Sequence, residues 1–73
     1  MINEHDPVVL TRDLPEAGLR RGDVGAVVLV HGAGEAFDVE FVSLDGETVA
    51  LETLKPADIR PGEHEILHAR NIA

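Results

Sequence analysis

The chain has 73 residues, no cysteine, two phenylalanines as its only Phe, Tyr or Trp residues, and a formal net charge of −8 at neutral pH. This length supports one domain with a thin aliphatic core, because so short a chain buries only about 60% of the surface that it exposes when unfolded. The absence of cysteine excludes disulfides and thiolate metal sites. The excess of acid disfavours nucleic acids and anionic membranes as partners.

The negative charge is concentrated in the middle of the chain. No Lys or Arg occurs between Asp23 and Leu54, whereas the flanking segments are nearly balanced in charge. The acidic residues of this stretch are Asp23, Glu35, Asp38, Glu40, Asp45, Glu47 and Glu52. A surface with this charge attracts a positively charged partner.

Targeting signals are not evident at the start of the chain. Residues 1–5 have neither the basic start nor the apolar run of a signal peptide. The longest apolar run, residues 26–30, is too short to cross a bilayer. We therefore expect a cytoplasmic protein that does not associate with membranes.

The first half of the chain predicts two strands that are separated by a long loop. Residues 7–11 are a short β-branched run, and the polar residues 12–22 that follow contain Pro15 and Gly18. Residues 24–31 leave no polar face, which is typical of a strand that is covered on both sides or bent. We expect Gly25 to be the bend.

The third strand has the clearest pattern in the chain. Phe37, Val39 and Phe41 alternate with Asp38 and Glu40, so that one face is apolar and the other acidic. The glycine-containing residues 32–35 before it predict a hairpin turn. Residues 36–41 therefore form a strand that contributes one face to the core.

The turn at Asp45–Gly46 determines how the third strand pairs with the fourth. A two-residue loop would place Phe41 opposite Ala50 and would leave Leu51 on the outer face. A three-residue loop, with Gly46 in a left-handed bulge position, turns the apolar side chains inward instead, and we favour it. Its pairs are Phe41 with Val49, Val39 with Leu51, and Phe37 with Thr53. The outer face would then carry Asp38 directly opposite Glu52.

The remaining residues complete a small all-β fold. Residues 55–58 predict a single 3-10 turn, and Ile59 with Arg60 forms a final short strand before Pro61. Five short strands in this order predict a small five-stranded SH3-like barrel over residues 1–61. Residues 62–73 are expected to form a short C-terminal tail, either flexible or helical.

Several segments resemble those of a family of small bacterial proteins that is classified as a domain of unknown function, DUF4926. The similarity spans roughly residues 6–61 and implies an SH3-like barrel, without an established biochemistry. The segments that carry it are residues 6–11, 13–16 with 18–19, 22–25, 36–41 and 45–48.

One string in the chain has the form of a catalytic motif. Residues 64–68 read His-Glu-Ile-Leu-His and match HExxH, which on a helix supplies two zinc ligands and a general base. The third ligand of the common zinc peptidases is missing downstream, and no scaffold is expected to enclose the motif. We interpret the match as coincidence and expect no enzyme activity, metal or cofactor.

The leading functional hypothesis is a noncatalytic protein-interaction module. Its acidic face would dock on a basic protein, as an antitoxin or immunity protein does, or as an accessory subunit of an enzyme. The residues expected to make this contact are Asp38, Glu40, Glu47 and Glu52.

Two alternatives remain open at this point. Residues 21–30 are similar to the glycine-containing strand of KOW-type barrels, which would suggest a nucleic-acid or ribosome-associated role. The residues that neutralise phosphates and stack on bases are too few for that role. The second alternative is a zinc-binding tail, and homo-oligomerisation is also left open.

Overall fold

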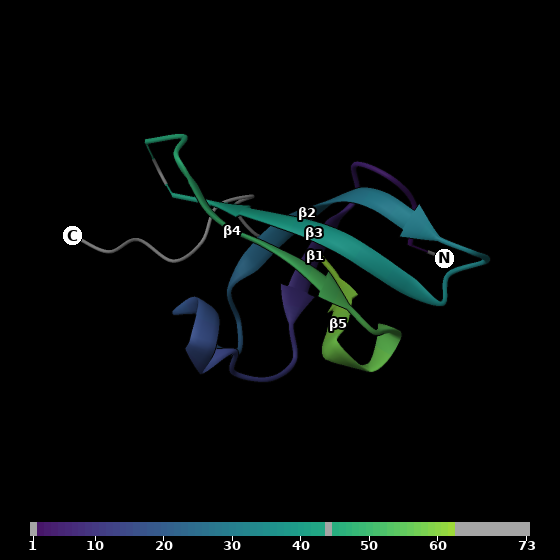
Figure 1. Cartoon of the computed structure of the whole chain (residues 1–73), viewed down its shortest axis with the longest axis horizontal. Coiled ribbons are helices and arrows are strands. Elements are labelled where there is room, and N and C mark those ends of the chain that lie inside the picture. Colours follow the sequence, from purple (N-terminus) through teal and green to yellow (C-terminus); the bar gives the residue numbers. More distant parts are fainter. Residues whose placement is uncertain (1, 44, 63–73) are drawn as a thin grey trace.

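The computed structural model describes residues 2–43 and 45–62 of the chain. Within them the chain forms a five-stranded sheet and two single-turn 3-10 helices (Figure 1). The elements are β1 (Pro7–Leu10), η1 (Pro15–Ala17), β2 (Val24–His31), β3 (Ala36–Val42), β4 (Thr48–Leu54), η2 (Pro56–Asp58) and β5 (Ile59–Pro61). The predicted all-β class is confirmed. No helix in this part of the chain has the length and hydropathy needed to span a membrane.

All neighbouring strands are antiparallel, and their order in the sheet is β4-β3-β2-β1-β5. The sheet is not closed into a barrel, because no ladder among the described strands joins β4 to β5. The five strands of the predicted SH3-like barrel are present, but among the described residues they form one open sheet. The strand β5 has only three residues, and it pairs with β1.

A second 3-10 turn forms where the sequence predicted only an irregular loop. Pro15 begins η1 with its φ already fixed, and Gly18 ends it in the left-handed conformation at φ 70°. An isolated bridge joins Leu14 to Leu19 across the turn, and both leucines are buried in the core. The loop after β1 is thus anchored by its own apolar residues.

The core lies on one face of the sheet, which we call the inner face. Phe37, Val39 and Phe41 of β3 are at most 4% exposed, as the alternation predicted. The remaining buried apolar residues of this cluster are Val8, Leu10, Leu14, Leu19, Val27, Leu54 and Ile59. Burial of such side chains contributes about 1.5–3 kcal/mol each relative to an exposed position.

Gly25 is needed because of close packing. A Cβ at this position would lie 2.7 Å from Val39 Cγ1 and 2.8 Å from both the Glu40 carbonyl oxygen and Phe41 Cδ2. The register irregularity of β2 lies between Val27 and Leu29, at Val28, so the expected bend at Gly25 is displaced along the strand. Gly25 allows β2 and β3 to approach, and the bulge changes the direction of the side chains that follow it.

The β3–β4 turn forms as predicted. The Ser43 amide donates to the Glu47 carbonyl oxygen at 2.8 Å, the Gly46 amide donates to the Ser43 carbonyl oxygen at 3.0 Å, and Gly46 has φ 88°. Val42 therefore pairs with Thr48, which is the register of the longer loop. Asp45 supports the turn, because its carboxylate accepts a hydrogen bond from the Ser43 hydroxyl. This hydrogen bond holds the pKa of Asp45 below its usual value.

A second bulge shifts the pairing of β4 with β3 by one residue after this turn. The register shifts between Phe41 and Val42, so that Phe41 pairs with Ala50 and the extra residue is Val49. Because a shift by one residue turns every following side chain to the other face, the favoured pairing of the apolar residues is wrong. The observed pairs are Glu40 with Leu51, Val39 with Glu52, Asp38 with Thr53 and Phe37 with Leu54. This register buries Leu54 opposite Phe37 in the core, where Leu54 is 3% exposed.

Candidate interaction surface

The outer face of the sheet combines carboxylates with exposed leucines. Asp38 and Glu40 point away from the core because they alternate with the buried residues of β3. Their cross-strand neighbours are Leu29 of β2, opposite Asp38, and Leu51 of β4, opposite Glu40. We define the outer face by six residues of these three strands: Leu29, His31, Asp38, Glu40, Leu51 and Thr53.

The two bulges are what expose the apolar residues. Leu29 follows the irregularity at Val28 and is 43% exposed, whereas Leu51 follows the irregularity at Val49 and is 60% exposed. Val28 and Val49 themselves are also exposed. In each case the extra residue turns a large side chain to solvent beside an acidic residue of β3. The apolar residues therefore lie on both sides of the central strand.

Asp38 is held by side chains from both neighbouring strands. Its Oδ1 lies 2.9 Å from His31 Nε2, and the Thr53 hydroxyl donates to the same oxygen at 2.6 Å. These contacts to the charged form, that of Thr53 above all, hold the pKa of Asp38 below its usual value. Asp38 is consequently a carboxylate at neutral pH in a fixed position.

Glu40 is oriented by a second threonine. The Thr48 hydroxyl donates to Glu40 Oε2 at 2.9 Å, so that both carboxylates of β3 accept hydrogen bonds from threonines of β4. Oriented carboxylates lose less side-chain entropy on binding a cation than free ones do. The outer face thus presents two preset acceptors between two exposed leucines.

The predicted acidic cluster is divided by the structure. Asp38 and Glu40 lie together on the outer face, but Glu52 is opposite Val39 and so belongs to the inner side of β4. Glu47 lies in the turn before β4. The expected contact between Asp38 and Glu52 is wrong, because the bulge at Val49 places Thr53 opposite Asp38. Whether these four residues bind a partner stays a prediction.

The sequence did not indicate the other members of the outer face. Leu51 was expected to face the core, and the strand that contains Leu29 was expected to be covered on both sides or bent. No motif in the sequence pointed to His31. The available signal was the run of residues 26–30, which has more apolar residues than one buried face can use. That surplus is now explained by the exposure of Val28 and Leu29.

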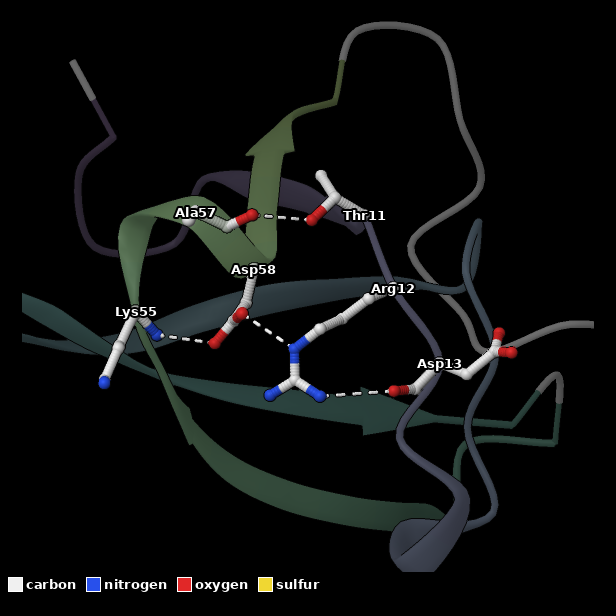
Figure 2. A network of polar contacts seen from close by, with 6 residues as sticks. All are labelled: Thr11, Arg12, Asp13, Lys55, Ala57 and Asp58. Atoms are coloured by element: carbon white, nitrogen blue, oxygen red, sulfur yellow. Dashed lines mark hydrogen bonds and ion pairs between the residues drawn. The ribbon is translucent and has the colours of Figure 1, made fainter.

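A separate polar network joins the loop after β1 to η2 (Figure 2). Arg12 Nε donates to Asp58 Oδ1 at 2.8 Å, and the Lys55 amide donates to the other carboxylate oxygen at 3.1 Å. The Thr11 hydroxyl donates to the Ala57 carbonyl oxygen at 2.7 Å. The Arg12 contact lowers the pKa of Asp58, and the same hydrogen bond raises the pKa of Arg12. The network holds η2 against the residues that follow β1, and the role of the network is structural.

Asp23 is the buried acid of the chain segments described here, with 3% of its surface exposed. Its Oδ2 accepts from the Arg20 amide at 2.9 Å, and its own amide donates to the Arg20 carbonyl oxygen at 3.0 Å. The Asp23 carbonyl oxygen in turn accepts from the Leu10 amide. Asp23 therefore closes the turn that leads into β2.

Metal ligation cannot be built from the described residues, which contain no group of three or more His, Asp or Glu side chains close enough to hold an ion. The HExxH string at residues 64–68 lies outside the described residues. The expectation that it holds no metal and no catalytic function stays a prediction.

Comparison with known proteins gives the family. The profile described as "Domain of unknown function (DUF4926)" matches residues 4–61. The chain belongs to the DUF4926 family. No curated protein and no solved structure matches it. The matched range of this DUF4926 protein coincides with the sheet and its two 3-10 turns, so the resemblance noted in the sequence is confirmed.

Proposed function

We propose that this DUF4926 protein is a noncatalytic interaction module, and that its outer face docks on a basic protein surface that also carries apolar side chains. The observation that carries the proposal is the pairing of Leu29 with Asp38 and of Leu51 with Glu40 across adjacent strands. Scattered exposed leucines are ordinary, but here they flank two oriented carboxylates on three neighbouring strands.

The two kinds of side chain have different effects on binding. Carboxylates on a chain of net charge −8 accelerate association with a cationic surface and determine its orientation. The leucines supply the apolar contact that retains the partner after encounter. The partner is thus a protein with Arg or Lys next to an apolar patch. This description fits an enzyme that the module inhibits, and it also fits a complex that the module supports.

The experiment is capture of partners by the immobilised full chain from a lysate of the source organism, followed by mass spectrometry. Two variants divide the face: Leu29→Ser with Leu51→Ser removes the apolar contact, and Asp38→Asn with Glu40→Gln removes the charge. The matched control is Glu16→Gln, which neutralises an exposed acid on η1, a different element.

We expect the wild-type chain and the control to capture the same basic protein and both double variants to lose most of it. The charge variant should associate more slowly, and its rate should depend less on salt. Equal capture by all four chains would contradict docking through the outer face. Capture of nucleic acid in place of protein would favour the KOW-like alternative.

A further inference from the structure

The strand β4 is a long free edge of the sheet. It has seven residues, and among the described strands it pairs with β3 alone. An edge strand carries a row of unpaired N–H and C=O groups, because alternate residues direct these groups away from the sheet. Such an edge accepts a further strand unless the chain protects it.

The other edge offers less backbone for pairing than β4 does. β5 has three residues and ends at Pro61, which has no amide hydrogen to offer. β4 contains no proline, glycine, lysine or arginine. After the irregularity at Val49 its pairing with β3 is regular from Ala50 to Leu54, so its free groups are evenly spaced over that segment. The segment from Ala50 to Leu54 is therefore suited to pair with an extended chain.

Charge determines which extended chain can pair there. Glu52 is the one charged residue of β4, and it has no ion-pair partner among the described residues. A second copy of this chain would bring another Glu52 and a further net charge of −8 to the same edge, and like charges across a strand pair are destabilising. An opposite charge across from Glu52 is stabilising. The edge thus disfavours its own copy and favours a basic strand.

We propose that the β4 edge binds an extended basic segment of the partner protein as an added strand of the sheet. A Lys or Arg of that segment lies opposite Glu52, and an apolar residue lies opposite Leu51. Successive residues of a strand point to opposite faces, so the recognised segment alternates basic and apolar residues. This inference rests on the proposed function, because it gives the docking surface a mode of binding.

The outer face and the edge are continuous at Leu51. Its side chain is 60% exposed on the outer face, while its backbone belongs to the free strand. A partner strand at β4 would extend the outer face by one strand and would bring its apolar side chains next to Leu51. The carboxylate of Glu40, opposite Leu51, would then face the same added strand at a longer distance.

The test begins with a display library of random peptides of about seven residues, the length of β4, selected on the full-length chain. We expect the enriched peptides to alternate Lys or Arg with Val, Ile or Leu. Amide hydrogen exchange by NMR is then measured with the best peptide, with its scrambled form of equal charge, and with a form N-methylated at alternate residues. Only the unmodified peptide should protect β4 amides that exchange rapidly in the free chain.

Charge-reversal variants provide the matched comparison. Glu52→Lys and Glu16→Lys change the net charge equally, but only Glu52 belongs to the strand. We expect Glu52→Lys to weaken binding of the peptide about tenfold, and Glu16→Lys to weaken it by less than about threefold. A peptide with Glu in place of the Lys or Arg opposite position 52 should regain binding to Glu52→Lys. This rescue requires that the variant is folded.

The outcomes separate the two proposals. Enriched peptides that bind without protecting any β4 amide, or that bind equally well when N-methylated, would overturn strand addition and leave docking by the outer face intact. Equal weakening by both charge reversals would overturn the pairing with Glu52. Absence of any enriched basic peptide would overturn the added strand, whereas loss of partner capture in the outer-face variants would still support docking.

Discussion

Replacement of Gly25 by alanine should destabilise the protein through a steric conflict between β2 and β3. The added Cβ would lie 2.7 Å from Val39 Cγ1 and 2.8 Å from the Glu40 carbonyl oxygen. A carbonyl oxygen in a paired strand cannot move away without disturbing the ladder, so the variant must separate the strands. Introducing a methyl group into a packed site costs about 1–3 kcal/mol, and alanine recovers about 0.4–1 kcal/mol by restricting the unfolded chain.

The net expectation for Gly25→Ala is a loss of about 2 kcal/mol in the free energy of unfolding. For a domain of this size that loss lowers the melting temperature by roughly 10 °C. Chemical denaturation monitored by far-UV circular dichroism measures it as a lower midpoint at an unchanged slope. A stability equal to that of the wild type would refute the close approach of β2 and β3.

A control and a double variant identify the cause. Gly46→Ala also adds a methyl group, but into open space at φ 88°, so only the backbone penalty of about 1 kcal/mol remains. Val39→Ala removes the atom nearest to the new methyl group. Gly25→Ala should therefore cost less in the Val39→Ala background than in the wild type. Strict additivity would assign the loss to something other than this contact.

Three further predictions concern the register, the pH dependence and the turn before β2. Leu54→Ala should cost about 2–4 kcal/mol in denaturant unfolding and Leu51→Ala less than about 0.5 kcal/mol, and the reverse order would contradict the observed pairing. The pKa values of Asp38 and Asp58 are lowered in the folded state. The stability that these two carboxylates contribute to the fold is therefore complete above the unfolded pKa of about 3.9 and is lost as the pH falls through the folded pKa values. Asp58→Asn should make the denaturation midpoint fall less steeply between neutral and acidic pH. Asp23→Ala should cost about 1–3 kcal/mol, since it removes the acceptor of the partly buried hydrogen bond from the Arg20 amide, and an unchanged midpoint would exclude that role.

The positions of the strands follow from residue pattern alone. The alternation over residues 36–41 specifies which side chains of β3 are buried, and Gly46 specifies the turn that follows, since a positive φ there suits glycine. Asp38 and Glu40 share a face for the same reason. These features depend on residues that are close in the sequence, where periodicity is informative.

The bulges could not be predicted in the same way. In the run Val27 to Val30 every residue is apolar, so the pattern gives no sign of which one is unpaired. At Val49 the sequence offered two registers that each buried some apolar residues, and the choice depended on the distant contact between Phe37 and Leu54. The position of Glu52 depended on that choice. Whether the five strands close into a barrel depends on contacts between strands that are distant in the sequence, which no local pattern reports.

The pairing of β3 with β4 underlies both the outer face and the proposed edge, and isotope-edited NOESY spectra of the labelled chain measure it directly. The register described here predicts NOEs from the Phe37 ring to the Leu54 methyl groups and from the Val39 methyl groups to Glu52. NOEs from Val39 to the Leu51 methyl groups, with Leu54 remote from Phe37, would contradict it, because Leu51 would then be buried.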